Sequence, residues 1–236
     1  MNITFLYHSS FLVELSGCTL LFDWYGGPVP DYDRSKPLYV FTSHHHGDHY
    51  APEIFAQLGM DNVWYVLANC IRLSAKRKAA LGIDDSHVFR LAAGRHLSLG
   101  GLDIQTYRST DAGVAFLVEV EGKTIFHAGD LHWWHWAEED AAWNQAMERD
   151  FKKECAKLQG KPVDVGFFVL DPRQEGEFWW GFDWWMRTME VKHAFPMHSW
   201  EDYTLVKTFR TLPCSAPYRD RVVEVSGKGQ VFSWED

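Results

Sequence analysis

A run of histidines directly after a predicted buried strand is the feature that most constrains this chain. Residues 38–41 read Leu-Tyr-Val-Phe, a short apolar run typical of a strand buried within a sheet. The segment HHHGDH follows at residues 44–49, on a loop at the strand's end, which is where α/β sheets usually place their ligands. A solvated polar loop would have to gather the imidazoles of His44, His46 and His49 and the carboxylate of Asp48 there for no reason. The run therefore predicts a metal-binding loop in an α/β fold.

The spacing of the pattern HxHxDH indicates which side chains share an ion. Alternate residues of an extended segment point the same way, so His44 and His46 are predicted to converge on one ion while His45 points elsewhere. Asp48 and His49 follow at the start of the next helix and are expected to face a second ion. Two ions about 3.5 to 4 Å apart can activate water for hydrolysis. Imidazole and carboxylate ligands suit Zn²⁺, Mn²⁺ or Fe, so we expect one or two divalent metal ions, with Zn²⁺ favoured.

The rest of the chain predicts two sheets covered by helices. Apolar patterns typical of strands predict strands over residues 3–8, 11–15, 18–22, 102–107, 114–120, 123–127, 165–170, 221–225 and 230–234. Helical spacing predicts helices over residues 51–58, 71–80, 137–158, 177–191 and 201–211. The length allows one large α/β domain or two small ones. Because we find no internal repeat and no low-complexity linker, a single domain over residues 1–236 fits best.

Charge and composition argue against several classes of function. The net charge of -9 disfavours a nucleic-acid-binding protein, which needs a basic face to neutralise phosphates. The 4 cysteines are widely spaced without a CxxC pair, which indicates reduced thiols in a reducing compartment. Residues 1–15 alternate like a strand and lack the pattern of a signal peptide, and no apolar run approaches the roughly 18 residues of a membrane span. We therefore expect a cytoplasmic protein with no membrane segment.

The order of these motifs resembles the metallo-β-lactamase superfamily. HxHxDH is followed by Gly129-Asp130 after one predicted strand and by His198 after another. The likeness runs from His8 to His198, and HxHxDH is its most specific motif. The resemblance implies a four-layer αββα sandwich. The opening HSSF at residues 8–11, and Asp23 after Leu-Leu-Phe, also resemble the branch that contains the ascorbate-6-phosphate lactonases.

The same resemblance implies how the metal ligands divide between two sites. Asp130 matches the carboxylate that bridges the two metals, and His198 completes the second site with Asp48 and His49. The family normally supplies a third histidine to the first metal just before the strand at residue 114, but this chain reads Ser-Thr-Asp at residues 109–111. Asp111 is the only strong ligand within reach. Either Asp111 replaces the histidine, or it caps a turn and the first site is weak or empty.

Other polar residues are candidates for roles around the ions. Asp48 is predicted to be catalytic, orienting the attacking water or carrying its proton. His8 is predicted to contact substrate, with a structural histidine at the end of a strand as the alternative. Asp23 is predicted to hold the second nitrogen of a liganding histidine, because metal sites generally need such a partner.

The histidines and aromatic residues that remain are assigned less specific roles. His132 and His135 follow Asp130 closely and either line the pocket or lie among surface aromatics. An aromatic cluster at residues 178–185 is most commonly core, with a substrate wall or a dimer face as alternatives, so a homo-oligomer is left open. We expect structural roles for the others, His87, His96 and His193.

These patterns predict a metal-dependent hydrolase that cleaves an ester, lactone or phosphoester bond of a small polar metabolite. One alternative is a nuclease of the same superfamily acting on RNA or DNA, against which the acidic charge counts. The other is a non-catalytic protein that binds metal or ligand, an alternative that rests on the altered third-histidine position.

Overall fold

Two mixed sheets carry the fold, one in each of two compact units. The computed structural model describes residues 1–234. The first unit comprises residues 1–92 with 228–234, and the second comprises residues 93–227. The single domain over residues 1–236 stays a prediction, and its last two residues lie outside the described part. None of the described helices is long and apolar enough to cross a membrane.

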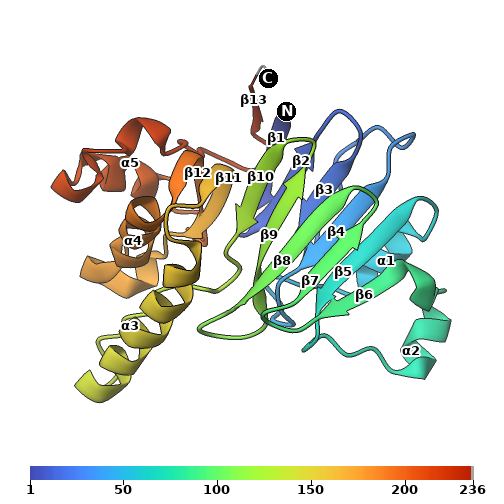
Figure 1. Cartoon of the computed structure of the whole chain (residues 1–236), viewed down its shortest axis with the longest axis horizontal. Coiled ribbons are helices and arrows are strands. Elements are labelled where there is room, and N and C mark those ends of the chain that lie inside the picture. Colours follow the sequence, from blue (N-terminus) through green and yellow to red (C-terminus); the bar gives the residue numbers. More distant parts are fainter. Residues whose placement is uncertain (235–236) are drawn as a thin grey trace. The chain divides into compact units, whose positions relative to one another are not determined.

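The sheet of the first unit has seven strands in the order β13-β1-β2-β3-β4-β5-β6 (Figure 1). The strands are β1 Asn2–Tyr7, β2 Ser10–Glu14, β3 Thr19–Phe22, β4 Leu38–Thr42, β5 Val63–Ala68, β6 Val88–Leu91 and β13 Val231–Ser233. β13, β1, β2 and β3 pair antiparallel, whereas β3, β4, β5 and β6 pair parallel. β4 is buried at every position, which explains its unbroken apolar sequence.

Two helices flank this sheet. α1 (Glu53–Leu58) buries Ile54, Phe55 and Leu58 in the same apolar cluster as residues of β4 and β5. α2 (Ala75–Ala80) has no buried residue and begins at Ser74, whose side chain accepts a hydrogen bond from Arg77 N–H. Sequence predicted this second helix from residue 71, but Leu73 and Ile71 belong to the buried cluster rather than to a helix.

The sheet of the second unit has six strands in the order β12-β11-β10-β9-β8-β7. The strands are β7 His96–Leu99, β8 Leu102–Arg108, β9 Val114–Val120, β10 Lys123–His127, β11 Pro162–Val169 and β12 Glu190–Met197. β7 to β10 pair antiparallel, and β10, β11 and β12 pair parallel. The predicted turn between β9 and β10 has Glu121 at φ 50° and Gly122 at φ 71°, the two positive values of a tight hairpin.

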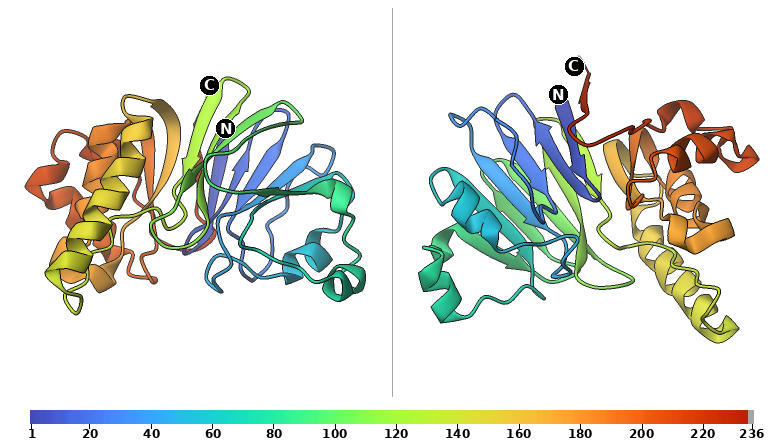
Figure 2. Two further views of the ribbon diagram at one scale, coloured as in Figure 1. Left: turned by 60° about the horizontal axis from the view of Figure 1, so that its bottom comes forward. Right: turned by 180° about the vertical axis from the view of Figure 1, so that it is seen from behind.

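Three α-helices lie on one side of β10, β11 and β12 (Figure 2). They are α3 Ala141–Cys155, α4 Trp180–Thr188 and α5 Thr204–Thr211. α3 begins after Asp140, whose carboxylate accepts a hydrogen bond from Trp143 N–H. The chain also forms short 3₁₀ segments at Asp85–His87, Ala156–Leu158, Pro172–Glu177, Pro213–Ser215 and Arg219–Arg221.

Two predicted elements of the second unit differ from the structure. The helix predicted over residues 177–191 is shorter, because Met189 is extended and β12 begins at the next residue. The strand predicted over residues 221–225 is wrong: a 3₁₀ segment ends at Arg221, and Val222 makes only an isolated bridge to Ala194. Val222 and Val225 are each 3% exposed, so these two valines are buried against the unit although their backbone does not pair in a ladder.

Candidate functional site

In the first unit, a buried aspartate fixes the start of the histidine loop. Asp23 follows β3, and Ser43 follows the parallel strand β4, so both lie at the same edge of the sheet. The Asp23 carboxylate accepts hydrogen bonds from Ser43 N–H at 2.7 Å and from Ser43 Oγ–H at 2.6 Å. Asp23 has φ 45° and is 1% exposed. The carboxylate therefore holds the point at which the loop leaves the strand.

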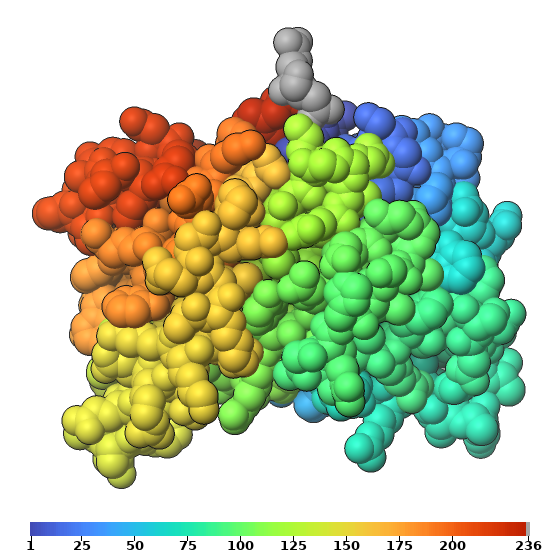
Figure 3. Space-filling view, in the orientation of Figure 1, coloured from blue at the N-terminus to red at the C-terminus, as the bar shows by residue number. Residues whose placement is uncertain are grey.

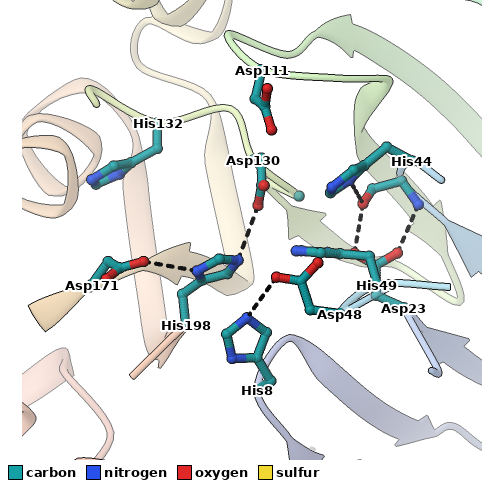
Figure 4. Close-up of polar contacts among 12 residues, drawn as sticks. His8, Asp23, His44, Asp48, His49, Asp111, Asp130, His132, Asp171 and His198 are labelled. Atoms are coloured by element: carbon teal, nitrogen blue, oxygen red, sulfur yellow. Dashed lines mark hydrogen bonds and ion pairs between the residues drawn. The ribbon is translucent and has the colours of Figure 1, made fainter. Parts of the chain in front are cut away.

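The same carboxylate orients a histidine of the loop. His49 Nδ1 lies 2.7 Å from Asp23 Oδ2, and both side chains are buried (Figure 4). Because a carboxylate only accepts, Nδ1 carries the proton and Nε2 is the nitrogen suited to ligate an ion. The predicted contact between Asp23 and a histidine of the loop is present.

The other predicted residues of the first unit gather around His49. The ring centroids of His44 and His46 are 4.6 Å apart, and those of His44 and His49 are 4.1 Å apart. His8 Nε2 lies 3.5 Å from Asp48 Oδ2. His8, Asp48 and His49 each offer a ligand atom within 4.8 Å of the others. The first unit therefore brings together His8, His44, His46, Asp48 and His49, with Asp23 hydrogen-bonded to His49.

In the second unit, predicted and unpredicted residues meet where β10, β11 and β12 end. Asp130 follows β10 after Gly129, and His198 follows β12 with φ 69°. His198 Nε2 lies 3.3 Å from Asp130 Oδ1, and both residues are buried. Because these strands are parallel and adjacent, their carboxyl ends share one edge of the sheet. The topology of this unit thus joins two residues that are distant in the chain.

Asp171 also belongs to this group, and sequence reasoning missed it. Its Oδ2 lies 3.0 Å from His198 Nδ1 (Figure 4). The same oxygen accepts a hydrogen bond from Trp200 Nε1–H at 3.2 Å. Arg173 donates to both carboxylate oxygens. Burial raises the pKa of Asp171, but the hydrogen bonds from His198 and Arg173 outweigh it and hold the pKa below its ordinary value. The available signal was its position directly after the predicted strand at residues 165–170.

Asp111 lies on the loop between β8 and β9. It is exposed, its N–H donates to Ser109 Oγ at 3.1 Å, and one carboxylate oxygen lies within 4.8 Å of one from Asp130. Thr110, which stands nearest the expected third histidine, has a different use. Its hydroxyl donates to His132 O at 2.6 Å and accepts from His132 N–H at 3.0 Å. Thr110 therefore ties the β8 loop to the loop that carries Asp130.

His132 is a core residue rather than a surface aromatic. It is completely buried, and its Nε2 lies 2.7 Å from Gln174 Oε1. Burial is the main cause that lowers the pKa of His132 to about 4, so the ring is neutral at pH 7. His135 is half-buried, with its ring centroid 4.9 Å from that of Trp180.

The aromatic cluster at residues 178–185 divides between core and surface. Phe182 and Trp185 are completely buried, which agrees with the commonest use of such a cluster. Trp180 and Trp184 are half-buried, and both contact the ring of Trp133.

Comparison with known proteins places these features in a family. A model described as the β-lactamase superfamily domain matches residues 2–145. The chain is 33% identical over 141 residues to a UPF0173 metal-dependent hydrolase of Desulforamulus reducens. That alignment covers 55% of this chain and 62% of the relative, so the match spans less than two thirds of the relative's length.

Two solved structures share the fold over nearly the whole chain. Igni18, a metallo hydrolase from the archaeon Ignicoccus hospitalis, aligns with a TM-score of 0.65 at 15% identity and 99% coverage of each chain. The metallo-β-lactamase fold protein YhfI from Bacillus subtilis aligns with a TM-score of 0.62 at 12% identity and 98% coverage of each chain. The family model covers more than half of the sequence, and the chain therefore belongs to the β-lactamase superfamily and has the metallo-β-lactamase fold predicted from its motifs.

Proposed function

We propose that the chain is a metal-dependent hydrolase whose ions are held by residues of both units. The ligands we propose are His44, His46, Asp48 and His49 from the first unit and Asp111, Asp130 and His198 from the second. The observation that carries the proposal is a buried carboxylate on Nδ1 of a buried histidine in each unit, namely Asp23 on His49 and Asp171 on His198. Histidines that ligate metals almost always donate their other ring N–H in this way.

The proposed ligand atoms fit a divalent ion of intermediate softness. Imidazole nitrogens and carboxylate oxygens suit Zn²⁺, Mn²⁺ and Fe, and we propose Zn²⁺ as the ion. When bound, such ions polarise the oxygen of the scissile bond and lower the pKa of water to about 7. In our proposal Asp111 joins His44 and His46 as a ligand of the first ion. This set of two histidines and one carboxylate would leave coordination positions for water.

Asp48 and His8 are the residues we propose for handling water and substrate. The Asp48 side chain is 31% exposed while that of His8 is 5% exposed, so Asp48 is the more accessible of the two. Their 3.5 Å separation lets His8 hold the carboxylate in position while Asp48 orients water or moves its proton. We propose an ester, lactone or phosphoester of a small polar molecule as substrate, in line with the hydrolase named among the relatives. Four cysteines without a disulfide favour a reducing compartment such as the cytoplasm.

Metal analysis of one matched pair of variants, combined with a substrate screen, tests this function. Asp130→Asn removes a proposed ligand, whereas Asp103→Asn alters the exposed pair between Asp103 and His96, whose atoms lie 2.7 Å apart in the same unit. We expect the wild-type chain to bind metal and to hydrolyse at least one ester, lactone, phosphomonoester or phosphodiester of the screen. Asp130→Asn should lose both the bound metal and this turnover, whereas Asp103→Asn should keep both.

The same experiment, extended by a binding assay with a short RNA, separates the alternatives. Bound metal without turnover of any compound in the screen would favour the non-catalytic binding protein. Tight binding of a short RNA with a steep dependence on salt would favour the nuclease. A wild-type chain that retains no divalent metal after purification in its presence would overturn the proposal.

A further inference from the structure

A pocket of about 450 Å³ lies in the second unit, apart from the residues proposed to hold metal. One wall is a face of α3 that includes Trp143, Met147 and Lys153. The other wall comes from Ala93 and Gly94 and from the end of β8, at Arg108 to Thr110. Figure 3 shows α3 in yellow adjoining the green segments of the same unit. None of the proposed metal ligands lines this pocket.

Positive charge in the pocket exceeds what its acidic residues offset. The Glu154 carboxylate accepts from Arg108 N–H at 2.8 Å and from Lys157 Nζ at 2.6 Å, so its charge is already compensated. Asp150 is exposed and lies 3.7 Å from Arg149, which is outside the pocket. The side chains of Arg108 and Lys153 form no ion pair within residues 1–234. Two cations therefore face one pocket in a chain whose net charge is -9.

The α3 wall also offers an apolar surface. Trp143, Ala146 and Met147 are half-buried, lie three and four residues apart on α3, and line the pocket on the same face of the helix. An indole face and a thioether make favourable contacts with a flat ring, and a guanidinium binds a carboxylate or phosphate through two parallel hydrogen bonds. Cations and an apolar wall in one pocket fit a molecule that has an anionic group on an apolar, ring-bearing body.

The floor of the pocket is shared with the loops of the candidate site. Thr110 lines the pocket, and its hydroxyl donates to His132 O at 2.6 Å and lies 3.2 Å from Asp130 O. Ser109 also lines it, and its Oγ accepts from Asp111 N–H at 3.1 Å. A molecule in the pocket would therefore touch residues that position two of the proposed ligands.

We propose that this pocket binds a small organic anion, with Arg108 and Lys153 contacting its carboxylate or phosphate and Trp143 contacting its ring. The proposal assigns a second ligand site to the molecule and does not depend on the hydrolase function. It rests on the unpaired cations, the apolar α3 wall and the volume of the pocket.

Calorimetric titration with matched probes tests the proposal. The probes are 1-naphthyl phosphate, 1-naphthoate and the neutral 1-naphthol, added to the full-length protein. We expect either or both anions to bind, and to bind more tightly than the neutral alcohol. Arg108→Gln and Lys153→Gln should each raise the dissociation constant by roughly tenfold, because each removes a charge-assisted contact. Lys207→Gln, a matched loss of charge on α5 outside the pocket, should leave it unchanged.

Two further variants separate this site from the proposed metal centre. Ala146→Trp fills the pocket without changing any charge and should abolish binding, while its melting temperature reports whether the fold survives. His44→Ala/His46→Ala removes proposed metal ligands and should leave binding intact. If binding is lost in His44→Ala/His46→Ala but kept in Lys153→Gln, the anion binds at the proposed metal centre. That result would support the hydrolase proposal, and it would overturn the proposal that the pocket binds the anion. Equal binding by all variants, or none by the wild type, would also overturn it.

Discussion

Replacing Asp171 by asparagine tests how the second unit holds His198. The carboxylate is completely buried and accepts hydrogen bonds from His198, Arg173 and Trp200. Asparagine keeps the shape, but one of its oxygens becomes an NH₂ group that cannot accept. Loss of one charge-assisted hydrogen bond costs about 1.5 to 3 kcal/mol of unfolding free energy. The Arg173 side chain is 48% exposed, so water offsets part of its loss.

The larger expected effect is on metal affinity. Removing the carboxylate partner of a liganding histidine typically weakens metal binding by about 10- to 100-fold. We expect that loss in Asp171→Asn, measured by competition with a chromophoric chelator, together with the stability loss measured by urea unfolding.

Asp164→Asn is the matched control for Asp171→Asn. Asp164 is a partly buried carboxylate of the same unit that accepts from Thr124 N–H at 2.8 Å and pairs with Lys192 at 2.6 Å. This variant should lose stability but keep its metal affinity. Equal metal affinity in Asp171→Asn and wild type, or an equal loss in both variants, would refute the role given to Asp171.

Three further predictions follow from the geometry. Asp23→Asn should weaken metal binding by about 10- to 100-fold through His49, and an unchanged dissociation constant would count against its positioning role. Gly181→Ala should cost about 1 to 3 kcal/mol in urea unfolding, because a Cβ there would lie 2.3 Å from His132 Cε1; a variant as stable as wild type would contradict this packing. Asp111→Ala should lose one equivalent of metal by elemental analysis, and an unchanged count would remove Asp111 from the ligand set.

Local patterns were sufficient to predict most strands and the histidine loop. The buried strand at residues 38–41 and the loop after it were predictable because a fully apolar run and a dense polar pattern are both local signals. The hairpin at Glu121-Gly122 was predictable because its turn type requires residues that tolerate positive φ.

Features that depend on neighbouring elements were not predictable in the same way. Asp171 stands alone in the sequence, and only the pairing of β11 with β12 brings it to His198. Thr110 stands nearest the position at which the third histidine ligand is expected, yet its hydroxyl hydrogen-bonds to the backbone of His132. The end of α4 was misjudged because Met189 and Val191 are buried apolar residues that continue the apolar pattern past Thr188, the last helical residue. In each case tertiary packing, rather than local propensity, decides the outcome.

Anomalous diffraction at the absorption edge of the bound metal tests the central proposal most directly. We expect one or two anomalous peaks, each about 2.0 to 2.2 Å from nitrogen or oxygen ligands. These ligands should include at least one of His44, His46 and His49 from the first unit and at least one of Asp130 and His198 from the second. Peaks coordinated by residues of one unit alone, or no peak in crystals grown with excess Zn²⁺, would contradict the account.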